Sequence, residues 1–263
     1  MTQIIKKKDK NLIKTFCHRG GFSSSSSLAK RFAGRGGRIA TMPDITNIRI
    51  NDDTGEHWNE YYTSMSAEYF GTGSDGKFKI IVAHNVGPMS TTFGAQKVYA
   101  WKGEDDNDNG KGGRITQEQF LKLESGQYGE VSVVDFNNYI NLYRLPFIQH
   151  IKLSEALVDP LAQARLGPKY EEYLLKQFEH SKEQHDLRGE HHPNDPCILN
   201  LENENGCGYR FVGQNKGYAV AHLLSTGRRD SSHGSRETHD MIDIACHGWS
   251  DGTRFIGVKP EFD

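Results

Sequence analysis

The sequence predicts an α+β fold in which helices pack on a single mixed, mainly antiparallel sheet, preceded by a flexible basic N-terminal arm. Apolar patterns of both strand and helix period are present, and they follow one another without the regular βαβ alternation of a doubly wound sheet. The first 38 residues are basic and rich in glycine and serine, whereas the patterning of a folded body begins after Thr41. We therefore expect a basic Gly/Ser/Arg-rich arm over 1–40 and an α+β globular domain over 41–263.

Length and composition limit the class of protein. A chain of 263 residues can bury a substantial core, and its longest apolar runs fall far short of the roughly 18 residues that a membrane-spanning helix needs. The four cysteines form no Cys-x-x-Cys pair, and the charged N-terminus has no signal-peptide core. We expect an intracellular, reducing compartment and no membrane partner. Organelle import is the alternative, because the arm is rich in serine and arginine and poor in acid.

The elements of the first half are predicted from local patterns. Apolar runs between turn residues predict strands. Aromatic side chains at spacings of three and four predict an amphipathic helix that ends at Gly71. A capping box formed by Thr116 and Gln119 predicts the start of a second helix. We expect strands over 45–50, 78–84, 96–102 and 130–136 and helices over 55–70 and 116–123.

The second half begins with its most helical part. Asp159 and Pro160 form a cap and first-turn pair, and Gly167 stops that helix before another begins. Short strands follow a polar loop, and the segment 235–248 is helical or extended. We expect helices over 159–166 and 168–188 and strands over 197–201, 208–213, 217–224 and 253–258.

The charge distribution is the clearest functional signal. Residues 1–38 carry ten Lys or Arg and one acid, a charge of +9, so the remaining residues carry −11 of the net −2. A polybasic segment of this kind is typical of contact with a polyanion, because each neutralised phosphate releases counterions. Alternatively, the arm is a solvated tail that docks on its own acidic body. The arginines that we expect to contact an anion in this segment are Arg19, Arg31, Arg35 and Arg38.

A second set of candidates has the chemistry of a catalytic site. His84 and His222 each end an apolar run and precede small residues, where an imidazole can serve in acid-base chemistry. His239-Asp240 is similar to the His-Asp pair of metal ligands in HD-type phosphohydrolases, a likeness of two residues that makes Asp240 a candidate. Arg228 and Arg229 would grip a phosphate group. For the histidines, the alternative is a core position bonded to the backbone.

These observations favour a binding or assembly protein whose basic N-terminal arm contacts nucleic acid, another polyanion or a neighbouring subunit. The alternative is a hydrolase-type enzyme that acts on a nucleotide or nucleic-acid substrate through His/Asp acid-base or metal chemistry. The sequence does not decide whether the protein is an enzyme. No Walker A, Gly-x-Gly-x-x-Gly or Gly-x-Ser-x-Gly motif is present, so it identifies no cofactor. Expected partners are nucleic acid or another polyanion, and a homo-oligomer or larger assembly.

Overall fold

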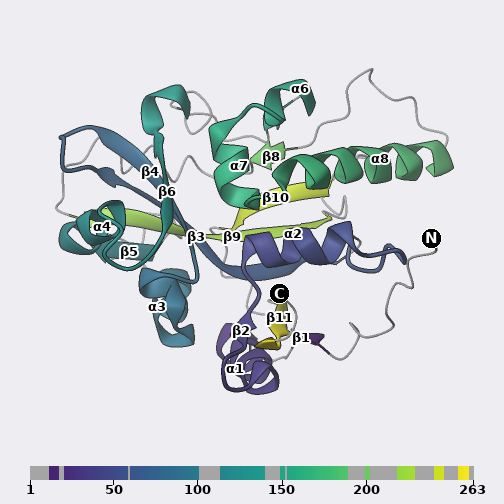
Figure 1. Cartoon of the computed structure of the whole chain (residues 1–263), viewed down its shortest axis with the longest axis horizontal. Coiled ribbons are helices and arrows are strands. Elements are labelled where there is room, and N and C mark those ends of the chain that lie inside the picture. The colour runs from purple at the N-terminus through teal and green to yellow at the C-terminus, as the bar shows by residue number, and fades with distance from the viewer. Residues whose placement is uncertain are drawn as a thin grey trace, which may run out of the picture.

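An antiparallel sheet of six strands forms the centre of the fold, and a smaller three-stranded sheet joins two distant parts of the chain (Figure 1). The computed structural model describes residues 12–17, 21–58, 60–100, 113–139, 149–151, 153–188, 199–201, 218–228, 240–245 and 254–260. The six-stranded sheet has the order β10-β9-β3-β4-β6, with β5 also paired to β9. Its strands are β3 (Tyr62–Thr72), β4 (Phe78–His84), β5 (Gly113–Thr116), β6 (Val131–Asp135), β9 (Tyr218–Arg228) and β10 (Asp240–Ala245).

The smaller sheets bring together residues far apart in sequence. In the three-stranded sheet, β11 pairs antiparallel with both β1 and β2, so that Ile13 lies opposite Val258. A separate pair is formed by β7 and β8. These strands are β1 (Ile13–Cys17), β2 (Arg38–Ile39), β7 (Gln149–Ile151), β8 (Leu199–Leu201) and β11 (Arg254–Val258).

Helices cover both faces of the central sheet. In Figure 1, α6, α7 and α8 lie on one side, and α1 lies with the three-stranded sheet on the other. The described helices are α1 (Gly21–Ala33), α2 (Met42–Ile50), α3 (Thr92–Ala100), α4 (Gln117–Glu124), α6 (Leu153–Ala156), α7 (Pro160–Leu166) and α8 (Tyr170–Arg188), with short 3-10 turns η2 (Gly87–Ser90) and η3 (Phe136–Tyr139). The α+β class and the mainly antiparallel sheet are confirmed.

Two hydrophobic cores lie on opposite faces of β3, because successive side chains of a strand point to opposite sides. Tyr62 and Phe70 belong to the core shared with α2, α6, α7 and α8. Met65 and Tyr69 belong to the core shared with α1, α3 and α4. Ser66 and Glu68 have the same parity as Tyr62 and Phe70, so polar groups face the first core. This face carries most of the groups considered below.

The predicted strand over 45–50 is wrong, because these residues belong to α2. The helix begins at a capping box in which Thr41 and Asp44 bond each other reciprocally, with Pro43 in the first turn. Ile45, Ile48 and neighbouring residues are buried on nearly all sides. A helix buried all round has no polar face, and the period of its apolar residues does not reveal it.

The predicted helix over 55–70 is wrong for a related reason. Its second half is β3, and every residue from Tyr62 to Gly71 is buried. Polar residues of β3 such as Ser64, Ser66 and Glu68 are buried together with its apolar ones, so polarity does not mark an exposed face, and its aromatic residues happen to fall at helical spacing. The strand predicted over 96–102 is also wrong, because α3 extends to Ala100.

The flexible basic arm is not confirmed. Residues 13–17 and 38–39 pair with β11, and residues 21–33 form α1. The serine run fits this packing because small side chains let α1 approach β11 closely: Ser25, Ser26 and Ala29 are buried. The Gly/Ser content that suggested a flexible linker therefore serves a tight helix–strand contact. Residues 1–11 and 18–20, with Arg19, lie outside the described residues.

Other predictions are confirmed. Thr116 and Gln119 form the expected capping box, and Asp159 caps α7, which ends at Gly167. The strands predicted near β4, β6, β8, β9 and β11 and the helix of α8 are present, and the segment 235–248 contributes the strand β10. The strand predicted over 208–213 lies outside the described residues.

Candidate functional site

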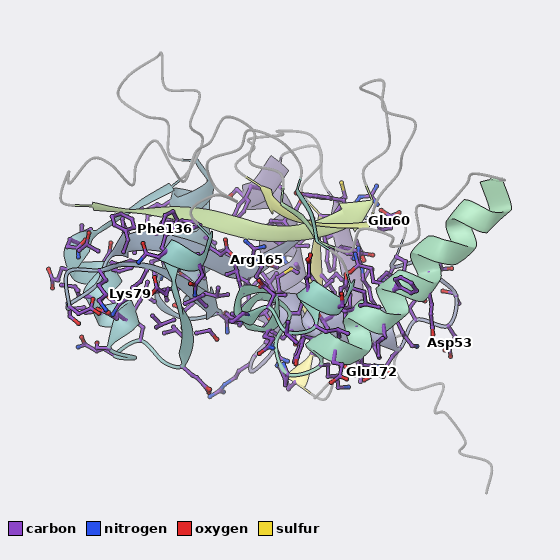
Figure 2. All side chains as sticks on the ribbon, turned by 90° about the horizontal axis from the view of Figure 1, so that it is seen from above. Asp53, Glu60, Lys79, Phe136, Arg165 and Glu172 are labelled. Carbon is purple, nitrogen blue, oxygen red and sulfur yellow. The ribbon has the colours of Figure 1, made fainter. Side chains whose placement is uncertain are left out.

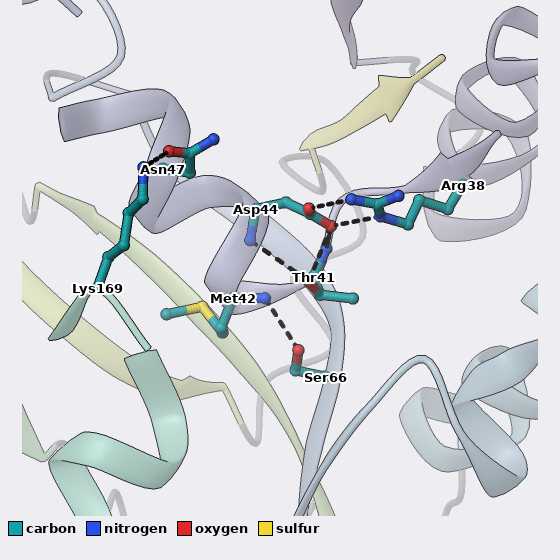
Figure 3. A network of polar contacts seen from close by, with 7 residues as sticks. All are labelled: Arg38, Thr41, Met42, Asp44, Asn47, Ser66 and Lys169. Atoms are coloured by element: carbon teal, nitrogen blue, oxygen red, sulfur yellow. Dashed lines mark hydrogen bonds and ion pairs between the residues drawn. The ribbon is translucent and has the colours of Figure 1, made fainter. Parts of the chain in front are cut away.

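His84 is held in a fully bonded position between the sheet and α7. Its Nε2 lies 2.8 Å from the Ala164 carbonyl oxygen, and its Nδ1 lies 2.7 Å from the Ser66 hydroxyl. Because a carbonyl only accepts, Nε2 carries the proton and Nδ1 accepts from Ser66. The Ser66 oxygen in turn accepts from the Met42 backbone N–H at 2.9 Å (Figure 3). This chain of bonds connects the start of α2, the strands β3 and β4, and α7.

The environment of His84 favours the neutral ring. Burial lowers its pKa below the ordinary value of 6.5, although the Ala164 carbonyl and the Asp44 carboxylate act in the opposite direction. Both ring nitrogens are already bonded to protein groups. His84 is half-buried, and its bond to the Ala164 carbonyl agrees with the backbone-bonded alternative.

A buried ion pair that the sequence did not predict lies on the same face of β3. Arg165 of α7 donates from Nε and Nη2 to the two carboxylate oxygens of Glu68, the second bond measuring 3.0 Å. The Arg165 side chain is 1% exposed and the Glu68 side chain is 0% exposed. Figure 2 shows Arg165 between the end of the molecule that carries Lys79 and the end that carries Glu172. Glu68 stands among the aromatic residues of β3, and this position was a sign in the sequence of a buried charge. Its partner Arg165 could not be identified from the sequence, because it lies 97 positions later.

His222 and Asp240 do not occupy one site. The register places His222 of β9 opposite Glu68 and places Asp240 of β10 opposite Arg228. His222 and Arg228 are six residues apart on one strand, which corresponds to about 20 Å. The structure thus brings Asp240 and Arg228 together and separates both from His222. Arg229 lies outside the described residues.

Arg38 has a structural role. Its Nη2 and Nε lie 2.7 and 3.0 Å from the two carboxylate oxygens of Asp44 (Figure 3). Asp44 also accepts from the backbone N–H and the hydroxyl of Thr41, both at 2.8 Å. A planar guanidinium that binds both oxygens of one carboxylate is a strong, directional pair. The contact joins β2 to the first turn of α2, and anion binding by Arg38 stays a prediction.

Cationic and aromatic side chains gather where β1, the end of α1 and the end of β11 meet. The Lys14 ammonium lies 5.6 Å from the centre of the Phe16 ring, and the Lys259 ammonium lies 5.0 Å from the centre of the Phe32 ring. The two rings contact each other at 5.7 Å between centres. We call this region the basic surface and define it as Lys14, Phe16, Arg31, Phe32, Arg35 and Lys259.

Backbone contacts hold the parts of the basic surface together. The Lys259 N–H donates to the Leu12 carbonyl at 2.9 Å, which joins the start of β1 to the end of β11. A Cβ built on Gly36 would lie 3.3 Å from Pro260, so the turn that carries Arg35 packs beside Lys259. Arg31 and Arg35 are exposed. Arg254, the nearest other cation of β11, is paired with Glu60.

Among the residues that the structure describes, no group of three or more His, Cys, Asp or Glu side chains is arranged to hold a metal ion. No helix in the described ranges is both long enough and apolar enough to cross a membrane.

Comparison with known proteins adds a likeness in fold. No protein-family model and no curated protein matches the sequence. One solved structure, described as "Accommodation of massive sequence variation in Nanoarchaeota by the C-type lectin fold", aligns with a TM-score of 0.59 over 95% of this chain and 99% of that chain, at 16% identity. The chain is similar in fold to that C-type lectin protein. At this identity, the likeness concerns the arrangement of helices and strands alone.

Proposed function

We propose that the protein is a binding protein that contacts nucleic acid through the basic surface. The observation that carries the proposal is that Lys14 and Lys259 lie over two aromatic rings that contact each other, with the exposed Arg31 and Arg35 close to Phe32 in the sequence. Cations interleaved with aromatic side chains suit a polymer of phosphates and bases. Four more lysines, Lys6, Lys7, Lys8 and Lys10, precede Leu12 in the sequence and add to the charge of this part of the chain.

Lys14 and Arg31 lie in the segment predicted as a flexible arm, but β1 and α1 carry them. A flexible arm would lose its conformational freedom on binding, whereas cations carried by β1, the end of α1, the turn after it and the residue after β11 are already placed. The body of the protein is acidic, so a nucleic acid would be attracted to this region and repelled elsewhere.

The experiment uses the full chain, because residues 13–17 and 21–39 are part of the fold. Fluorescence anisotropy with a labelled oligonucleotide is measured from 50 to 300 mM salt. The double variant Arg31→Gln/Arg35→Gln should weaken binding and reduce the slope of log affinity against log salt by about 1.4, or about 0.7 for each lost phosphate contact. Lys77→Gln/Lys97→Gln is the matched control, since both lysines are exposed on other elements. Equal effects of the two double variants would contradict the proposal.

The likeness in fold favours a second candidate, a ligand-binding protein whose scaffold tolerates sequence changes in the segments that join its strands. The protein of similar fold is described as accommodating massive sequence variation. In this chain, residues 229–239 connect Arg228 to Asp240, which are paired across β9 and β10. Replacing 229–239 with a Gly/Ser sequence of equal length should then change the melting temperature by less than about 4 °C, the equivalent of 1 kcal/mol or less. A larger loss would place this segment in the core and contradict the candidate.

The hydrolase alternative has less support from the described residues. Both ring nitrogens of His84 are bonded, and Asp240 is about 20 Å along the sheet from His222. A hydrolase that used His84 would lose its activity in His84→Gln with the fold intact.

A further inference from the structure

The proposed nucleic-acid-binding function leaves open which form of nucleic acid the basic surface recognises. The four side chains Lys14, Phe16, Phe32 and Lys259 form a continuous row in which each lysine lies over one ring and the two rings touch. We name this row the cation–aromatic ladder. We propose that the ladder selects single-stranded over double-stranded nucleic acid by stacking unpaired bases on Phe16 and Phe32. This inference rests on the proposed function and specifies its substrate class.

The position of the rings supports base stacking. Phe16 and Phe32 are only partly buried: Phe16 packs against a core that includes Phe22 and Phe255, and Phe32 contacts Phe16. Side chains at alternate positions of a strand lie on one face, so Lys14 and Phe16 of β1 share a face. Phe32 comes from the last turn of α1. The ladder is therefore built from three separate elements, and its rings are fixed by packing rather than carried on a loop.

A base can stack on a ring of the ladder only if it replaces the lysine that lies over that ring. In the free protein, each ammonium covers a ring through a cation–π contact. An exposed contact of this kind is weaker than the stacking of a base on an aromatic ring. A base can therefore displace the ammonium from the ring, and the freed ammonium lies next to the phosphate of the same nucleotide. Bases inside a duplex are already stacked and paired, so a duplex binds to the lysines through its phosphates but does not stack bases on the rings.

The charges around the ladder favour an anionic ligand over an apolar one. An apolar peptide would also cover two aromatic rings, but the flanking cations Arg31, Arg35, Lys14 and Lys259 call for an anionic partner. Arg254 and Arg38 are neutralised by Glu60 and Asp44, so these two cations do not count toward the charge available to a ligand.

The test compares a labelled 15-nucleotide oligo(dT) with a duplex of the same length, using the full chain. Phe32→Leu and Phe16→Leu keep the charge and an apolar side chain at each position. Each should weaken oligo(dT) binding about 5- to 10-fold, leave duplex binding within about 2-fold, and leave the salt slope unchanged. Phe93→Leu is the matched control, because Phe93 is 67% exposed and Lys97 lies 4.5 Å from its ring centre, but it lies outside the ladder.

The outcomes separate the inference from the function on which it rests. If the wild-type chain binds neither nucleic acid, the proposed function fails. If the chain binds both forms with equal affinity, or if Phe93→Leu weakens oligo(dT) binding as much as Phe32→Leu does, the inference is overturned while the proposed function stands. Thermal melting of each variant establishes that the fold is retained, and Phe16→Leu provides the second reading if Phe32→Leu is unstable.

Discussion

Gly257 of β11 and Ala29 of α1 are in direct backbone contact, since a Cβ built on Gly257 would stand 2.5 Å from the Ala29 carbonyl oxygen. The same Cβ would lie 2.9 Å from the Phe32 ring. No flexible side chain can move to relieve the first contact, because a helix carbonyl is fixed by its own hydrogen bonds. This close contact packs the serine-rich helix α1 against β11, the strand that pairs with β1 and β2.

Gly257→Ala should therefore destabilise the protein by overpacking, by about 1–3 kcal/mol. The free energy of unfolding is measured by urea denaturation. Ser27→Ala is the control, because Ser27 is exposed on α1 and alanine is the better helix former. The control should be neutral or slightly stabilising. A Gly257→Ala protein as stable as wild type would mean that α1 does not pack on β11 at this distance.

Breaking the buried Glu68–Arg165 pair should be costly. Glu68→Gln or Arg165→Met alone leaves one group without its charged partner in a fully buried position, and each should lower the free energy of unfolding by about 3–5 kcal/mol. The double variant Glu68→Gln/Arg165→Met removes both charges and should lose clearly less than the sum of the single losses. Additive losses in this double-mutant cycle would contradict a direct interaction between the two residues.

Acid should destabilise the protein through His84. Its pKa is lowered in the folded state by burial. The unfolded chain therefore binds more protons than the folded chain below about pH 6.5, so the free energy of unfolding falls as the pH falls from there. His57, whose pKa is also lowered by burial, contributes in the same direction.

The measurement is the free energy of unfolding at pH 8, 6.5 and 5 for wild type and His84→Gln. The variant should be less stable at pH 8, because the bonds of His84 are disturbed, but it should lose less stability between pH 6.5 and 5. His57→Gln tests the second histidine separately. An unchanged pH dependence in His84→Gln would mean that His84 does not titrate in this range in either state.

Arg38 and Arg35 should behave in opposite ways. Arg38→Lys loses the two-bond contact with Asp44 and should lower stability by about 1 kcal/mol, a modest value because the arginine side chain is 27% exposed. Its effect on oligonucleotide affinity should be small. Arg35→Gln should leave stability within about 0.5 kcal/mol and weaken binding. If Arg38→Lys weakened binding more than Arg35→Gln, Arg38 would belong to the binding site after all.

Local signals predicted those parts of the fold that local interactions determine. The capping box at Thr116 and the cap at Asp159 involve residues three positions apart. Half-exposed helices and edge strands also keep the alternation of apolar and polar residues that indicates their period. The central elements α2 and β3 were misassigned because both are buried on all sides, which removes the polar face that distinguishes the two periods.

The candidate site was predictable in its charges but not in its geometry. The basic residues near the N-terminus were evident, yet Lys259 joins them only through the pairing of β1 with β11, which no local pattern indicates. His84 was identified as a polar group at a strand end, whereas its bond to Ala164 depends on a contact 80 positions away. The sequence alone could not show that Arg38 is paired with a carboxylate whereas Arg35 is exposed, because this depends on the position of Asp44.

The pairing of β1 with β11 also sets the order in which the protein can be completed during synthesis. Ile13 meets Val258 in this sheet, so Ile13 must wait until 245 further residues have been synthesised before it finds its partner. At about 5–20 residues per second, this delay is on the order of ten seconds or more. During that time the apolar face of α1 has no strand to cover it. Contacts of such long range also slow folding, so the N-terminal helix, although made first, would be among the last elements to dock.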